Sequence, residues 1–219
     1  MSFTPDTRAA AVDAILDAAA VLPVLSIERL DQALPLAQTL VEAGLPVLEV
    51  TLRHPAAVEA IRLIASDVPG VIVGAGTVLD GGQLAQVTEA GARFAIAPGA
   101  TDALYAAAAE TAIPLIPAVA TASDIMRGLE HGHRRFKFFP AAAAGGIAAL
   151  RAFAGPFPQV RFCPTGGIDA ASAPDWLALS NVATVGGSWM VPADALSDGD
   201  WPRIASLARR AAALRPQPL

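Results

Sequence analysis

The chain has 219 residues, of which 54% are hydrophobic and 16% charged, and its formal net charge is −5. The high apolar fraction excludes a disordered chain, and the acidic balance without a long basic run argues against a nucleic-acid binder. The length predicts a single domain over residues 1–219, of the size of an α/β barrel. The low charge density indicates that some apolar surface is covered between subunits.

The start of the chain lacks the features of a targeting segment. It is polar, and the Ala-rich stretch behind it carries Arg8, Asp13 and Asp17, so the uncharged core of a signal peptide is missing. No apolar stretch reaches the length of about 18 residues that a membrane-spanning helix needs. We therefore expect a cytoplasmic protein with no membrane partner.

Short apolar runs alternate with longer, Ala-rich amphipathic runs along the chain. An extra helix is expected first, over residues 7–20. The expected strands begin, in chain order, near Pro23, Pro46, Val71, Phe94, Pro114, Arg134, Arg161 and Val182. Their starts lie roughly 20 to 27 residues apart, the span of one strand, one helix and two short loops. The helices between them are expected to open with the capping residues Asp31, Asp80, Thr101 and Asp169.

Strands that are apolar along their whole length predict a parallel sheet covered by helices. Such βα units close into a TIM (β/α)8 barrel or remain an open, doubly wound sheet. No GxGxxG sequence follows the first strand, and polar residues or glycines recur at the carboxyl ends of many strands. These features favour the barrel, with the extra N-terminal helix plugging its amino-terminal end.

Lys137 is the strongest single indication of chemistry, because it is the only lysine in the chain. It lies in Phe136-Lys137-Phe138-Phe139, an apolar strand. Desolvation there favours the neutral amine, which is the form that attacks a carbonyl to make a Schiff base. The alternative is a lysine held in a salt bridge or reaching to solvent from an edge strand.

Glu49, Thr51 and Arg53 alternate along the second expected strand and so share one face, the barrel interior. A buried glutamate beside a lysine can shuttle a proton, although a structural ion pair of Glu49 with Lys137 or Arg53 is an equally open reading. Arg53, at the carboxyl end of the strand, is placed to bind a carboxylate.

Two glycine pairs end the last two strands, Gly166-Gly167 after Thr165 and Gly186-Gly187 before Ser188. Barrels frequently bind phosphate at this position through backbone N–H groups. Tight turns without a ligand are the alternative. The three histidines show no metal-binding spacing, so no metal site and no cofactor is expected.

The order of these motifs resembles one enzyme family. The motifs are GLPVLEVTLR, VGAGTV, FAIAPG, FKFFPA, FCPTGG, and GGSW with VPADAL. Together they resemble the class I aldolases that act on 2-keto-3-deoxy-6-phosphogluconate (KDPG), often also on 4-hydroxy-2-oxoglutarate (KHG). The resemblance covers nearly the whole chain, and it implies a homotrimeric TIM barrel of the Entner–Doudoroff pathway.

The resemblance also implies roles for individual residues. Lys137 matches the Schiff-base lysine and Glu49 the general acid/base. The remaining matches are substrate contacts: Arg53 and Thr77 for the pyruvyl carboxylate, Pro98 and Phe139 for the apolar walls, and Thr165, Gly166, Gly167, Gly187 and Ser188 for the phosphate. One departure is that Ala142, Ala143 and Ala144 follow Ala141, where relatives carry a glutamate.

The resemblance implies that the enzyme cleaves KDPG to pyruvate and glyceraldehyde 3-phosphate. Members of the family often also cleave KHG to pyruvate and glyoxylate. One alternative is the sister aldolase for the galactonate epimer, which differs at C4. Another is a phosphosugar-binding barrel in which Lys137 is only an ion-pair partner.

Overall fold

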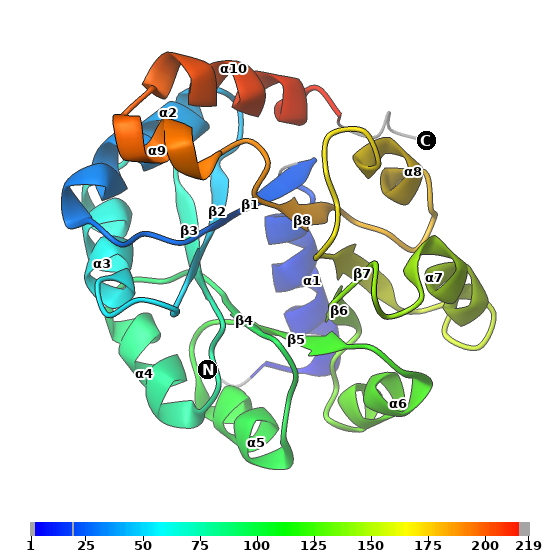
Figure 1. The fold of residues 1–219 in the computed structure, drawn as a ribbon. Coiled ribbons are helices and arrows are strands. Elements are labelled where there is room, and N and C mark those ends of the chain that lie inside the picture. Colours follow the sequence, from blue (N-terminus) through cyan, green and yellow to red (C-terminus); the bar gives the residue numbers. More distant parts are fainter. Residues whose placement is uncertain (1–2, 19, 215–219) are drawn as a thin grey trace.

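The computed structural model describes residues 3–18 and 20–214, and its core is a ring of parallel strands surrounded by helices (Figure 1). The eight strands run in the order β7-β6-β5-β4-β3-β2-β1-β8. The ring closes between β7 and β8 through two isolated bridges, Phe162 to Val182 and Thr165 to Gly186. The expected TIM-type barrel is thus confirmed, and the open sheet is excluded.

The strands are β1 (Val21–Leu25), β2 (Val47–Thr51), β3 (Ile72–Gly76), β4 (Ala95–Ala97), β5 (Leu115–Val119), β6 (Arg135–Phe138), β7 (Arg161–Pro164) and β8 (Val185–Gly187). The helices are α1 (Pro5–Leu16), the 3₁₀ turn η1 (Leu30–Gln32), α2 (Ala33–Glu42), α3 (Ala57–Asp67), α4 (Gly81–Glu89), α5 (Asp102–Glu110), α6 (Ala122–Glu130), α7 (Gly146–Ala154), α8 (Ala173–Leu177), α9 (Ala193–Asp198) and α10 (Trp201–Ala212). Within the described residues, no helix is long and apolar enough to cross a membrane.

Alternation along β2 sorts its side chains between two environments. Leu48 and Val50 belong to the large apolar layer between strands and helices. Val47 belongs to a second, smaller cluster inside the barrel, and Glu49 is buried with Thr51. Because successive strand residues face opposite sides, Glu49 and Thr51 point into the barrel, as expected.

Helix α1 closes the amino-terminal end of the barrel. Val12, Ile15 and Leu16 pack in one cluster with interior strand residues such as Phe94 and Ile116. The expected range of 7–20 was wrong at both ends. The helix begins at Pro5 because Thr4 caps it, and it ends at Leu16; Ala19 lies outside the described residues.

Ion pairs fasten α1 to the strands that it covers. Asp13 accepts from Arg135 at 2.6 and 2.7 Å and from Arg161 at 3.0 Å. Arg161 also pairs with Asp17 at 3.0 Å. These contacts orient the helix so that its apolar face meets the barrel interior.

Two of the four expected helix caps are confirmed. The side chains of Asp80 and Thr101 accept backbone hydrogen bonds at the starts of α4 and α5. Asp31 was wrong, because it lies within η1 and its carboxylate binds Arg29. Asp169 was also wrong as a cap of α8. It lies four residues before Ala173, the first residue of α8, and its carboxylate instead accepts from the N–H of Ser172 in the preceding turn.

Candidate active site

The centre of the site is an ion pair between β6 and β2. Lys137 Nζ donates to Glu49 Oε1 at 2.9 Å and to Oε2 at 3.2 Å. The side chains are 8% and 1% exposed, respectively. A buried lysine paired with a single carboxylate can pass its proton along this hydrogen bond, which leaves an amine and a carboxylic acid side by side.

Both members of the pair are fixed by the strands that carry them. Lys137 is flanked by Phe136 and Phe138, whose side chains are fully buried in the outer apolar layer, so that the lysine itself faces the interior. Cys163, level with Lys137 on β7, is buried beside it. Burial raises the pKa of the Cys163 thiol to about 12, which keeps it protonated and makes it packing rather than a nucleophile.

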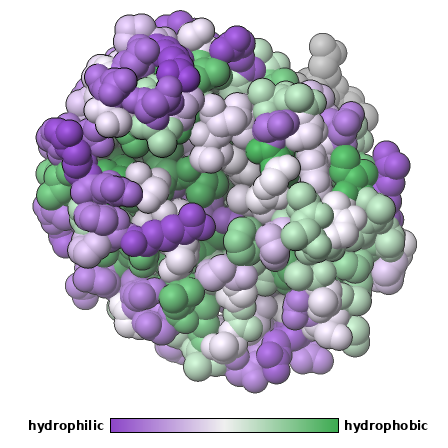
Figure 2. Space-filling model, viewed as in Figure 1, coloured by the Kyte–Doolittle hydropathy of each residue, from purple (hydrophilic) through white to green (hydrophobic). Residues whose placement is uncertain are grey.

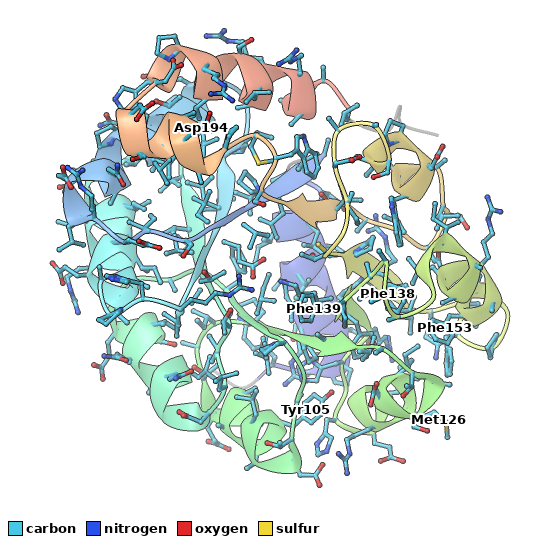
Figure 3. All side chains as sticks on the ribbon, viewed as in Figure 1. Tyr105, Met126, Phe138, Phe139, Phe153 and Asp194 are labelled. Atoms are coloured by element: carbon cyan, nitrogen blue, oxygen red, sulfur yellow. The ribbon has the colours of Figure 1, made fainter. Side chains whose placement is uncertain are left out.

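Phe139 forms a wall next to the lysine. Its ring centre lies 5.6 Å from Lys137 Nζ. Figure 3 shows Phe139 near the middle of the ring of strands, with Phe138 and Phe153 lying toward α7. Phe139 and Pro98 together line a small cavity of about 120 Å³, which is also lined by buried Tyr105 and exposed Arg127. The structure therefore brings both predicted wall residues to one cavity, and one of them, Phe139, also lies next to Lys137.

Thr77 directly follows β3 and has an unusual backbone conformation. Its φ is 60°, and it is the one positive-φ residue other than glycine in the described part of the chain. A β-branched residue in this region is strained by about 1–3 kcal/mol, and such strain is concentrated at functional sites. The geometry thus singles out a residue to which the family resemblance gave a carboxylate-binding role.

Arg53 lies two residues beyond β2 and is exposed. It lines a cavity of about 400 Å³ together with Thr51, Ser26 and Ser188. Figure 2 shows the same face, with hydrophobic residues visible between the hydrophilic surface of α9 and the ring of strands. Arg53 and Ser188, which are far apart in sequence, therefore share one opening at the carboxyl ends of β2 and β8.

The glycine pair after β7 has a backbone conformation that favours glycine. Gly166 and Gly167 have φ of 102° and 75°, which side-chain-bearing residues rarely adopt. Within the described chain, neither N–H donates to a backbone carbonyl. Thr165 is buried and bridges to Gly186 of β8, so its side chain lies deeper than exposed Gly167 and Ser188.

The alanine-rich segment after Phe139, where relatives carry a glutamate, is hydrogen-bonded to this turn. Ala141 N–H donates to Thr165 at 2.8 Å and Ala142 N–H donates to Gly166 at 3.0 Å. A methyl group on Gly167 would lie only 2.6 Å from the Cβ of Ala142. The loop above the lysine is therefore joined through its backbone to the predicted phosphate turn.

Several residues of the site were missed by sequence reasoning. Glu28 and Arg29 line the large cavity beside Arg53, although neither belongs to a strand. Their place three and four residues after β1, in the loop at its carboxyl end, was the available signal. Of the described residues, no group of three or more His, Cys, Asp or Glu side chains is arranged to hold a metal ion.

The family sequence profile described as "KDPG and KHG aldolase" matches residues 12–207. The chain belongs to this family. The KHG/KDPG aldolase of Escherichia coli K12 is 58% identical over 199 residues, which cover 91% of this chain and 93% of that protein. This finding confirms the resemblance drawn from the motifs.

Solved structures of KDPG aldolases agree over nearly the full barrel. That of Legionella pneumophila, with pyruvate captured at low pH as a covalent carbinolamine intermediate, has a TM-score of 0.90 and 50% identity, and covers 91% of this chain and 97% of that one. That of Zymomonas mobilis ZM4 with 3-phosphoglycerate has a TM-score of 0.88 and 49% identity, and covers 93% and 95%. Members of the family are thus known in complex with a covalently held keto acid and with a phosphorylated ligand.

Proposed function

We propose that this chain is a class I aldolase that cleaves KDPG to pyruvate and glyceraldehyde 3-phosphate, and KHG to pyruvate and glyoxylate. The observation that carries the proposal is the buried pair of Lys137 and Glu49, 2.9 Å apart, in the interior of the barrel. The covalent carbinolamine in the Legionella pneumophila relative supports a nucleophilic amine in the same fold.

The first stage is formation of the imine. Lys137 passes one proton to Glu49, and the neutral amine attacks the C2 ketone of the substrate to give a carbinolamine. Glu49, now a carboxylic acid, protonates the departing hydroxyl group, and water leaves. The product is a protonated imine that can accept an electron pair.

The second stage is cleavage of the C3–C4 bond. Glu49 removes the proton of the C4 hydroxyl, directly or through a water, and the bonding electrons move into the imine. Glyceraldehyde 3-phosphate leaves and an enamine remains on Lys137. Glu49 then returns this proton to C3 of the enamine, and addition of water releases pyruvate and restores the amine, so that no electrons are gained or lost.

The other predicted residues bind the two ends of the substrate. We assign the carboxylate of the pyruvyl part to Arg53 and Thr77, with Pro98 and Phe139 as apolar walls. The phosphate is assigned to the turn and strand ends formed by Thr165, Gly166, Gly167, Gly187 and Ser188. The unused N–H groups of Gly166 and Gly167 support this assignment, because oriented backbone donors bind phosphate.

Borohydride reduction with pyruvate tests the proposal most directly. We expect one irreversible adduct, located on Lys137 by peptide mass spectrometry. An unmodified protein, or an adduct confined to the N-terminal amine, would overturn the imine mechanism. Retained cleavage in Lys137→Arg would instead favour a barrel in which this lysine only forms an ion pair.

The preference for the gluconate substrate is a separate part of the proposal. The relatives of highest identity described above carry KDPG in their names, which supports the gluconate over the galactonate epimer. Comparing kcat/KM for cleavage of the two epimers tests this choice directly. A higher value for the galactonate substrate would assign the chain to the sister activity.

We also propose that the enzyme is a cytoplasmic homotrimer. The exposed side chains of Leu79 and Met126, 58% and 56% accessible, offer apolar surface for subunit contact. Light scattering of the purified protein should give three times the chain mass, and cell fractionation should recover the activity in the cytoplasm. A monomer at micromolar concentration would contradict the assembly.

A further inference from the structure

Gly76, the last residue of β3, lies directly against the carboxylate of Glu49. A methyl group on Gly76 would come within 2.7 Å of Glu49 Cγ and 2.8 Å of Cδ. It would come closer still to Oε1, the oxygen that accepts the shorter hydrogen bond from Lys137. The carboxylate therefore occupies the space that any side chain at position 76 would fill.

The backbone of Gly76 does not require glycine. Its φ is not among the positive values found in the described residues. It is paired in the regular ladder with Thr51, and its carbonyl accepts from Leu52 N–H at 2.8 Å. Glycine inside a strand costs stability, and its usual reason is the close approach of another group. Here that group is the side chain of Glu49.

We propose that Gly76 is a positioning residue, which sets the carboxylate of Glu49 against Lys137 by leaving room for it. The inference rests on the proposed function of the pair. Glu49 comes from β2 and Lys137 from β6, so two separate strands must hold the pair within 2.9 Å. The missing side chain on β3 determines how far the carboxylate can lean toward the lysine.

An alanine at position 76 would move the carboxylate without touching the lysine. Glu49 would have to turn away, or β3 would have to shift, and either change lengthens the 2.9 Å contact. Lys137 would keep its place on β6 and could still add to pyruvate. A displacement of a catalytic group by about 1 Å can cost about 100-fold in rate. Proton transfer is thus expected to suffer far more than imine capture.

Gly74 supplies a matched control two residues earlier on the same face of β3. A methyl group there would first meet the ring of Phe94, whose nearest atoms would lie at 2.5 and 2.6 Å. Gly74→Ala therefore imposes a comparable packing conflict inside the same barrel, against an apolar ring. The two variants separate an effect on the carboxylate from an effect on packing.

The experiment uses pyruvate alone in D₂O, with the purified full-length enzyme. Exchange of the methyl protons reports the proton transfer, and borohydride trapping reports the imine. We expect Gly76→Ala to slow exchange by about 100-fold while the Lys137 adduct still forms at long times. Folded Gly74→Ala should keep most of the wild-type exchange rate. Adding Gly76→Ala to Glu49→Gln should cost little more, because the group it acts through is already lost.

Stability measurements keep the test decisive if Gly76→Ala folds poorly. Gly76→Ala should lower the Tm of the wild-type protein but leave the Tm of Glu49→Ala unchanged, since the conflicting atoms are then absent. An equal loss of Tm in both backgrounds would overturn the inference, as would wild-type exchange by Gly76→Ala. Failure of the wild-type protein to form the adduct or to exchange protons would instead overturn the proposed function.

Discussion

Replacing Glu49 by glutamine separates the proposed proton transfer from a purely structural ion pair. Glutamine keeps the size of the side chain and one carbonyl acceptor, but it removes the charge and the exchangeable proton. The pair is short, at 2.9 Å, and both side chains are almost completely buried. The substitution therefore acts on the stability of the fold and on the chemistry, and the two effects have different sizes.

The stability effect follows from leaving a buried amine without its counter-charge. Removing one partner of a buried pair costs about 3–5 kcal/mol. The glutamine carbonyl still accepts from Nζ, so we expect the lower end of this range, about 3 kcal/mol. At this chain length 1 kcal/mol corresponds to about 2–4 °C, which gives a fall in Tm of about 6–12 °C. The variant should stay folded at 25 °C.

The effect on chemistry is larger if Glu49 moves protons. Turnover should then fall by about 10²–10⁴-fold, the usual range for a lost general acid/base. Single-turnover cleavage of KDPG, followed by a coupled assay for pyruvate, measures the chemical step. The pyruvate adduct of Lys137 should still form at long times. A folded variant with nearly wild-type turnover would refute the proton-transfer role and leave only the structural one.

Three further predictions concern residues around this pair. Thr77→Gly should melt no lower than wild type, because relief of backbone strain of about 1–3 kcal/mol offsets the added entropy of the unfolded chain. Its KM for substrate should rise, and a clear fall in Tm would contradict the reasoning. Ser188→Ala should weaken binding of KDPG more than of unphosphorylated KHG, whereas equal losses would indicate a role in folding. Burial lowers the pKa of His133 to about 3, so protonation of the unfolded chain below about pH 6.5 should cost stability as the pH falls. Denaturant melts at pH 8 and pH 5 should show about 2 kcal/mol less acid destabilisation in His133→Leu than in wild type, and an equal loss in both proteins would contradict this.

The strands were predictable because their signal is local. Six of them begin within one residue of the expected position. The first starts two residues early, at Val21, because the apolar residues before Pro23 already join the ladder with β8. The last starts three residues late, at Val185, because Val182 makes only an isolated bridge to Phe162.

The central pair was also accessible from sequence. A single lysine in an apolar strand was predicted to be buried, and the alternation along the second strand places Glu49 on the face toward the barrel interior. The structure joins the two side chains there by a hydrogen bond. The role of Gly76 was not accessible, because it depends on the side chain of a neighbouring strand. The clustering of Tyr105 with His131 and His133 is hidden for the same reason, since α5 and the end of α6 meet only in the fold.

The plug formed by α1 affects the route by which substrate and products reach and leave the proposed site. Val12, Ile15 and Leu16 fill the end of the barrel behind Lys137, and Asp13 anchors them to two strands. We therefore expect substrate, both products and the hydrolytic water to pass through the opposite, carboxyl-terminal end of the barrel. In the proposed mechanism the pyruvate part is still bound to Lys137 as an enamine when the aldehyde forms, so the aldehyde leaves first and pyruvate leaves only after hydrolysis. The covalent bond to Lys137 thus sets the order of release, and the closed end of the barrel sets the route.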